Sequence, residues 1–301
     1  DMFFYIESKC ARSYIAGDDD QTIYTFQGAD PDIFINLKGV SDPQIKSRRV
    51  PRKIHKLAES IFPHMTNRLK KKWEPRDAEG NIYDDIPFQD IDFSKGNWMI
   101  LTRTNKMLSA LKDHLYDLNL RFDAKQQELL PKKMVNAYRV WIRLNQGAFV
   151  NKEDLKDLWD YLTVKQGHLV RGYASNKTLE SVDSINIEGL REHYGLRAAG
   201  GWETLNFPEN SKIYIRTILK NGDDLMKPAR IKLSTIHSVK GEECDNVVLF
   251  TDLERIIYES SQNDADAEHR TFFVGITRAK ENLFIVNQDY EYQYNIGAPI
   301  I

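Results

Sequence analysis

The chain has 301 residues, of which 41% are hydrophobic and 29% are charged, and its formal net charge is −2. This composition supports one large or two medium domains, and it excludes a global basic field, so nucleic acid would have to bind in a local groove. The two cysteines, Cys10 and Cys244, lie far apart, which argues against a disulfide scaffold or a zinc site and predicts a reducing compartment, the cytoplasm. No apolar run approaches the ~20 residues of a membrane span.

The N-terminal part of the chain predicts a polar loop after an apolar segment. The run RSYIAG (residues 12–17) indicates a short buried strand, and the acid-rich sequence GDDDQTIYTFQGA (residues 17–29) follows it. In this loop, Gln21 carries a neutral amide that can donate to an oxyanion or orient a water molecule. Tyr24 and Phe26 are two positions apart and would share one face of an extended segment. Taken alone, these residues would more simply form a surface turn and a pair of core aromatics.

The next segments predict a hinge, a helix and a buried strand. NLKGVSDP (residues 36–43) combines glycine, serine and proline, which is typical of a hinge, and a helix is predicted to open at Pro51. Residues 73–97 are rich in proline, glycine and aspartate, so we expect a solvated loop or a small hairpin there. WMILTR (residues 98–103) is a continuous apolar run followed by leucines at helical spacing, as in a strand-then-helix unit of a parallel sheet.

Residues 120–228 are predicted to be mainly helical. Helices are expected at residues 132–145 and around residues 155–162, where apolar side chains recur at helical spacing. The runs IKLSTI, NVVLF and NLFIV, which begin at residue 231, predict a return to strands. The sequence therefore indicates an α/β domain whose sheet is interrupted by a helical insertion.

Polar groups in the second half stand beside these predicted strands. LSTIHSVKGEE (residues 233–243) places Thr235 and His237 on one strand-to-helix turn, and a hydroxyl and an imidazole can both bond phosphate oxygens. Arg278, in EHRTFFVGITRA (residues 268–279), lies between an amphipathic helix and a strand. Its guanidinium fork suits phosphate oxygens better than a lysine would. Lone histidines are usually structural, so these residue types alone do not decide the function.

Five segments of the chain closely resemble the later motifs of UvrD/Rep-type superfamily 1 DNA helicases. GDDDQTIYTFQGAD is similar to the third motif of that family, and SRRVPRKIHKLA is similar to the fourth. WMILTRTN resembles the strand segment that follows the fourth motif. LSTIHSVKGEECDNVVLF is similar to the fifth motif, and EHRTFFVGITRA is similar to the sixth. The order of these segments is that of the family, and so is the wide gap before the fifth. Residues 120–231 carry no match.

The resemblance implies a fold and a division into domains. The implied fold class is α/β, with a RecA-like (P-loop NTPase-type) parallel sheet domain and a helical insertion subdomain. Residues 1–38 would be the tail of a first RecA-like domain. Residues 39–122 and 229–301 would form the second RecA-like domain, and residues 123–228 would form the insertion subdomain.

The resemblance also assigns residues to ATP. Gln21 matches a glutamine that contacts the terminal phosphate in the family, and Arg49 and Arg278 match arginines that reach that phosphate from the second domain. Glu243 matches an acidic residue that approaches the nucleotide ribose. Glu268 either helps to orient Arg278 or lies solvated at a helix start.

A second group of residues is assigned to single-stranded DNA in the same way. Tyr24 and Phe26 match aromatic residues that stack on bases, and stacking depends little on base sequence. Thr235 and His237 match residues that grip the DNA backbone. No metal site is expected within the chain, because its seven histidines show no paired-ligand spacing.

The implied cofactors are ATP and Mg²⁺. Neither the G-x-x-x-x-G-K-[ST] phosphate loop nor the acidic Walker B signature is present in the sequence, and the chain begins DMFFYIESKC. We therefore expect that these residues alone do not hydrolyse ATP, and that an N-terminal RecA-like domain of the same protein supplies the phosphate loop and the Mg²⁺ site.

The expected function is that of the C-terminal part of an ATP-dependent DNA helicase or translocase, which would move 3′ to 5′ on single-stranded DNA as the family does. One alternative is a non-hydrolysing module of the same fold that binds nucleic acid or acts as a scaffold. Another is the helicase portion of a helicase–nuclease. An upstream phosphate loop in the same reading frame would favour the helicase over the module.

Overall fold

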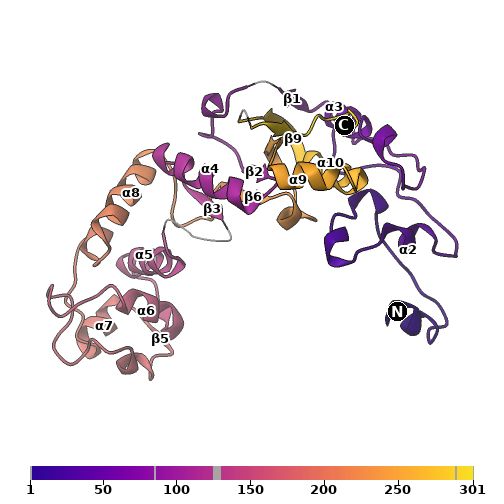
Figure 1. Ribbon diagram of the computed structural model, residues 1–301. Coiled ribbons are helices and arrows are strands. Elements are labelled where there is room, and N and C mark those ends of the chain that lie inside the picture. The colour runs from indigo at the N-terminus through magenta and orange to yellow at the C-terminus, as the bar shows by residue number, and fades with distance from the viewer. Residues whose placement is uncertain (1, 85, 125–129, 289, 301) are drawn as a thin grey trace. The chain divides into compact units, whose positions relative to one another are not determined.

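The computed structural model describes residues 2–84, 86–124, 130–288 and 290–300 (Figure 1). Contacts divide the chain into two compact units. The sheet unit comprises residues 1–108 and 234–301, and the helical unit comprises residues 109–233. Among the described residues, no helix has both the length and the apolar character needed to cross a membrane. The boundaries predicted for the first and second RecA-like domains stay predictions.

A six-stranded sheet confirms the α/β fold class. Its strand order is β1-β9-β7-β2-β6-β3, and the registers of β1 with β9, β7 with β9, β2 with β7 and β3 with β6 are all parallel. Every residue of β2 is buried, as expected for a parallel sheet that is covered on both faces. The strands are β1 (Asn81–Tyr83), β2 (Trp98–Thr102), β3 (Phe122–Ala124), β6 (Ile231–Thr235), β7 (Cys244–Phe250) and β9 (Ala279–Val286).

Helix α10 (Ala265–Ile276) packs on the sheet within the sheet unit (Figure 1). Asp264 caps its N-terminus by accepting a hydrogen bond from the backbone of Ala267, and ten of its twelve residues are buried. Gly275 allows the close approach, because a Cβ there would lie 2.9 Å from Cδ1 of Leu249 on β7. This burial fixes the backbone that leads directly to Arg278.

The remaining elements of the sheet unit are short. Helix α3 (Arg52–Glu59) begins after Pro51, as predicted, and buries Ile54 and Ala58. An antiparallel pair, β8 (Asp252–Leu253) with β10 (Tyr292–Gln293), lies outside the main sheet. The others are α1 (Met2–Glu7), η1 (Asp19–Gln21), η2 (Thr25–Gln27), α2 (Pro31–Ile35), η3 (Phe62–His64), η4 (Phe88–Asp90), η7 (His237–Val239) and α9 (Arg255–Ser261). Helix α4 (Asn105–Asp117) and strand β6 each cross the boundary between the units, and β3 belongs to the helical unit.

The helical unit has its own hydrophobic core. Trp141 and Trp159 are almost completely buried, and their indole nitrogens donate to backbone carbonyls, which satisfies their polar atoms. The prediction of helices at residues 132–145 and around residues 155–162 is confirmed by α5 and α6. The elements are α5 (Lys132–Asn145), β4 (Val150–Asn151), α6 (Lys152–Trp159), η5 (Asn176–Leu179), β5 (Ser184–Ile185), α7 (Ile187–His193), η6 (Trp202–Thr204) and α8 (Glu209–Lys220).

Two local predictions were wrong. Residues 12–16 form an exposed, irregular segment rather than a buried strand, because no described strand pairs with them. The described part of residues 73–97 is neither a solvated loop nor a hairpin. It contains the edge strand β1, which pairs in parallel with β9, and Phe88 and Phe93 are buried against the sheet unit's aromatic side chains. A three-residue strand is too short to leave a periodic pattern in the sequence.

Candidate functional site

Arg278 lies between α10 and β9, and its side chain is 0% exposed. Its Nε donates to the carbonyl of Val274 at 2.8 Å, and Nη1 donates to the carbonyl of Glu242 at 2.9 Å. Its Nη2 donates to Oγ1 of Thr277 at 3.1 Å and to Oε1 of Gln21 at 3.3 Å. The structure thus brings together two of the residues predicted to serve the terminal phosphate, one from each end of the chain.

Arg49 brings a second guanidinium close to Arg278. Its Nη1 lies 3.9 Å from Oε2 of Glu243, and its buried Nε has no hydrogen-bond partner among the described residues. Burial, and after it the charge of Arg49, lower the pKa of Arg278 to about 9, so this guanidinium still carries its charge at neutral pH. Burial also lowers the pKa of Arg49. A buried guanidinium beside a half-buried one that has an unsatisfied donor favours a bound anion.

A cavity of about 740 Å³ opens beside these residues in the sheet unit. Gln21 and Arg49 line it, together with Asp18, Lys71 and Trp73. Its volume lies in the range of small-molecule and cofactor sites. Its lining combines aromatic side chains with charged groups of both signs. The cavity gives an anionic ligand access to Arg49 and Gln21.

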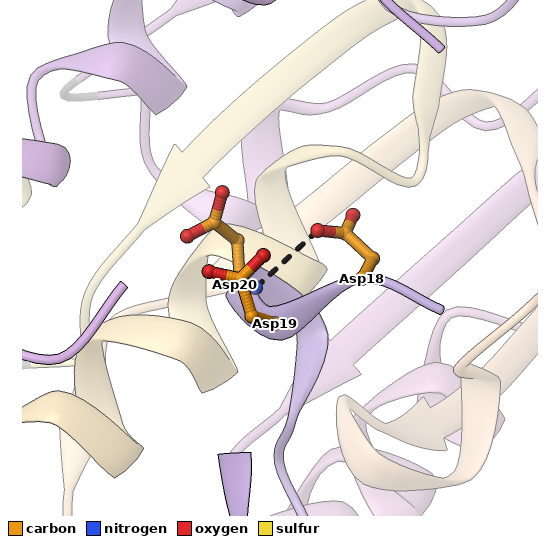
Figure 2. A group of neighbouring side chains, drawn as sticks. All are labelled: Asp18, Asp19 and Asp20. Atoms are coloured by element: carbon orange, nitrogen blue, oxygen red, sulfur yellow. Dashed lines mark hydrogen bonds between the residues drawn. The ribbon is translucent and has the colours of Figure 1, made fainter. Parts of the chain in front are cut away.

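The predicted acid-rich loop forms a 3-10 turn, which we call the acidic turn (residues 18–21). Oxygen atoms of Asp18, Asp19 and Asp20 lie within 4.8 Å of one another, and the backbone N–H of Asp20 donates to Asp18 (Figure 2). Their carboxylates are nevertheless already paired with cations, because Arg68 holds Asp20 through two hydrogen bonds of 2.9 Å and Lys71 contacts all three. The ion pairs with Arg68 and Lys71 therefore explain why three carboxylates can lie so close together.

Tyr24, Phe26 and His237 form an aromatic cluster in the sheet unit. Ring centroids lie 6.0 Å apart for Tyr24 and Phe26, and 5.6 Å apart for Phe26 and His237. The hydroxyl of Tyr24 donates to the carbonyl of His237 at 2.6 Å, which links the third-motif segment to the fifth. The two aromatics meet through the 3-10 helix η2 rather than through the extended segment that spacing predicted. Phe26 is 69% exposed, so its ring is open to a ligand.

Comparison with known proteins adds to this geometry. Residues 205–290 match the family described as the UvrD-like helicase C-terminal domain. The chain carries a UvrD-like helicase C-terminal portion. It is also 22% identical over 192 residues to a "Probable DNA helicase II homolog" of Mycoplasma capricolum subsp. capricolum, a match that covers 60% of this chain and 26% of that protein. The chain thus spans about a quarter of the length of this relative.

The UvrD-like match covers part of the candidate site. Thr235, His237, Glu243 and Arg278 lie within residues 205–290, and the fold joins them to third- and fourth-motif residues outside that range. Thr235 is 7% exposed at the end of β6, and its hydroxyl donates to Oγ of Ser238 at 3.0 Å. That bond turns the hydroxyl of Thr235 toward the turn that carries His237, and its DNA-gripping role stays a prediction.

Electrostatic partners in the UvrD-like portion were missed by sequence reasoning. Glu268 neither contacts Arg278 nor lies solvated, because Arg103 binds its carboxylate at 2.8 Å and 3.0 Å and the side chain is 3% exposed. Burial, and after it the charge of Arg103, lower the pKa of His237 to about 4, so this imidazole is neutral at pH 7. The sequence carries one signal for the ion pairs of the acidic turn, which is the basic run that contains Lys71. Such a run is usually a solvated face, so it did not predict these contacts.

Proposed function

We propose that this chain is the C-terminal part of an ATP-dependent DNA helicase or translocase that moves 3′ to 5′ on single-stranded DNA. The observation that carries the proposal is the contact of Arg278 with Gln21 beside Arg49. Three motif segments supply these residues, and together they place two guanidinium groups and an amide at one site. The family match supports a helicase role.

In this proposal, Arg49, Arg278 and Gln21 face the terminal phosphate of ATP, and Glu243 faces the ribose. The unsatisfied Nε of Arg49 and the lowered pKa of Arg278 fit a site that gains energy when a phosphate binds. ATP with Mg²⁺ would supply the phosphoryl group whose transfer to water drives movement. The arginines neutralise charge that develops on that group, and burial strengthens the effect because water is excluded.

A first RecA-like domain of the same protein is the proposed partner of this site. The phosphate loop and the Mg²⁺ ligands would come from that domain, because the sequence here contains neither motif. The two free cysteines, Cys10 and Cys244, are compatible with the reducing cytoplasm in which we propose that the protein works.

Single-stranded DNA is the proposed substrate of the aromatic cluster. Phe26 would stack on a base, with Tyr24 and His237 supporting its ring, and the hydroxyl of Thr235 and the imidazole of His237 would hold the backbone. The acidic turn ends at Gln21, and η2 begins at Thr25. A shift of Gln21 at the nucleotide would therefore be transmitted to Tyr24 and Phe26 through very few bonds.

The test uses the protein as its gene encodes it, with Arg278 replaced by lysine or by alanine. Lysine keeps the charge but removes the fork, so hydrolysis stimulated by single-stranded DNA should fall on the order of 10³-fold, the lower range for loss of such an arginine. The Kd for single-stranded DNA should change less than about threefold, because the aromatic cluster lies on other elements. Circular dichroism checks that both variants remain folded.

Full hydrolysis by the lysine variant, with its fold intact, would contradict the role of Arg278. A wild-type protein that binds single-stranded DNA but hydrolyses no ATP would instead favour the non-hydrolysing module. The two results differ, because the first needs an active wild-type enzyme and the second excludes one.

A further inference from the structure

One lysine, Lys71, contacts all three carboxylates of the acidic turn. Nζ of Lys71 lies 2.6 Å from Oδ1 of Asp18 and 3.1 Å from Oδ2 of Asp20, and it also bonds the carboxylate of Asp19. Asp19 and Asp20 are 0% and 1% exposed, so their charges depend on partners inside the protein.

Lys71 is itself held in place by its neighbours in the basic segment (residues 68–71). Arg68 binds both oxygens of Asp20 and lies 3.7 Å from the ring centre of Phe62. The backbone N–H of Leu69 donates to Oδ2 of Asp19 at 2.7 Å. Because these contacts tie the segment just before Lys71 to Asp19 and Asp20, Lys71 approaches Asp18 from a fixed direction.

Asp18 determines which way the amide of Gln21 points. Its Oδ2 accepts a hydrogen bond from Nε2 of Gln21 at 2.5 Å, while Oε1 of Gln21 accepts from Arg278 at 3.3 Å. A carboxylate only accepts hydrogen bonds and a guanidinium only donates them. Only one orientation of the amide therefore satisfies both neighbours. In the flipped amide, the N–H donors of Gln21 would face the N–H donors of the guanidinium, and its oxygen would face the carboxylate.

We propose that Lys71 is a positioning residue for nucleotide hydrolysis, which holds Asp18 so that Gln21 presents its amide correctly to Arg278 and to the terminal phosphate. This inference rests on the function proposed above. Lys71 lines the same cavity, but its ammonium is already paired with three carboxylates, so in this proposal it acts through Asp18 and Gln21 rather than on the nucleotide. Its loss should therefore lower kcat and leave KM for ATP nearly unchanged. In this orientation, the second N–H of the Gln21 amide is the group that would donate to the terminal phosphate.

Two variants of the full-length protein test the role. Lys71→Met removes the ammonium and keeps the length of the side chain. Asp18→Asn retains a single oxygen for two donors, so either Lys71 or Gln21 loses its bond, and this position is exposed enough for the variant to fold. In each case kcat for DNA-stimulated hydrolysis should fall on the order of 10²-fold, the size expected for misplacing a reacting group.

Matched controls separate positioning from general damage. Lys53→Met alters an exposed lysine of α3 and should leave kcat within about twofold of wild type. Lys71→Arg keeps the charge and should recover most of the lost activity. In a Gln21→Ala background, adding Lys71→Met should lower kcat no further, because the two residues act along one chain of contacts.

The outcomes distinguish this inference from the function on which it rests. A wild-type protein without DNA-stimulated hydrolysis overturns the proposed function, whatever Lys71 does. An active wild type whose Lys71→Met and Asp18→Asn variants match Lys53→Met overturns the positioning role, as does a full additional loss in the Gln21→Ala background. Should Lys71→Met fail to fold, the Asp18→Asn variant decides between these results.

Discussion

The amide oxygen of Gln21 and Nη2 of Arg278 lie 3.3 Å apart, although 257 positions of sequence separate the two residues. The contact joins the acidic turn to the end of α10 and places a neutral amide against a buried cation. It brings two groups that suit phosphate chemistry into one corner of the sheet unit. Several consequences for activity and stability can be measured.

Replacing Arg49 should separate hydrolysis from DNA binding. Arg49→Gln removes a guanidinium whose Nε is unsatisfied and whose charge contributes to the low pKa of Arg278. We expect kcat for DNA-stimulated hydrolysis to fall about 10²- to 10³-fold, as for the loss of one preorganised donor. The Kd for single-stranded DNA, measured by fluorescence anisotropy, should stay within about threefold of wild type. An equal loss in both measurements would contradict a nucleotide-specific role.

Removing the exposed ring of Phe26 should weaken DNA binding without affecting the fold. Base stacking on one aromatic ring contributes about 1–3 kcal/mol, so Phe26→Ala should raise the Kd for single-stranded DNA roughly 5- to 150-fold. Phe26 is 69% exposed, and the melting temperature should therefore hardly change. Tyr14, which is 91% exposed outside the cluster, provides the matched control as Tyr14→Ala. If both variants bind alike, the ring of Phe26 does not stack on a base.

His237 should make stability depend on pH in a defined window. Its pKa is about 4 in the folded protein, against 6.5 for the unperturbed side chain, because burial and then Arg103 disfavour the charged imidazole. The unfolded chain therefore takes up this proton first, and the contribution of His237 is complete above pH 6.5 and lost as the pH falls toward 4. Between pH 7.5 and 5, the melting temperature should fall more for wild type than for His237→Gln. Parallel curves would contradict this assignment.

Gly80 should tolerate alanine poorly. Its φ is +68°, and a Cβ would lie 2.4 Å from Cγ of Pro51, a rigid ring just before α3. The left-handed backbone costs about 1–2 kcal/mol and the overpacking a further ~1–3 kcal/mol, so Gly80→Ala should lower the free energy of unfolding by about 3 kcal/mol. Gly28→Ala is the control, because its φ is +86° with no atom within 4 Å. Gly28→Ala should lower the free energy of unfolding only by the cost of the left-handed backbone. Equal losses for the two variants would show that the contact with Pro51 does not matter.

Helix α5 and strand β2 illustrate what the sequence predicts well. Apolar residues at helical spacing gave the bounds of α5, and a continuous apolar run gave β2, because both patterns follow from local geometry. Strand β1 and the irregular residues 12–16 were missed because pairing with a partner, and not composition, decides whether a short segment becomes a strand.

For the candidate site, the resemblance supplied the predicted residues, and the structure supplied their supports. Arg278 and Gln21 could be named because their motifs resemble those of the helicase family. The contacts of Lys71 with Asp18 and of Arg103 with Glu268 span 53 and 165 positions, and no local pattern in the sequence encodes such long-range pairs. Long-range ion pairs of this kind appear only once the fold brings their elements together.

Helix α10 has almost no surface of its own, since ten of its twelve residues are buried. It therefore leaves little room for amino-acid replacement, and adaptation to new substrates would have to occur on other elements. For the experimenter, fluorescent or spin labels intended to follow nucleotide-driven motion belong on the exposed faces of α3 or α9. A probe attached within α10 would disturb the packing of its buried residues, and its signal would reflect that disturbance.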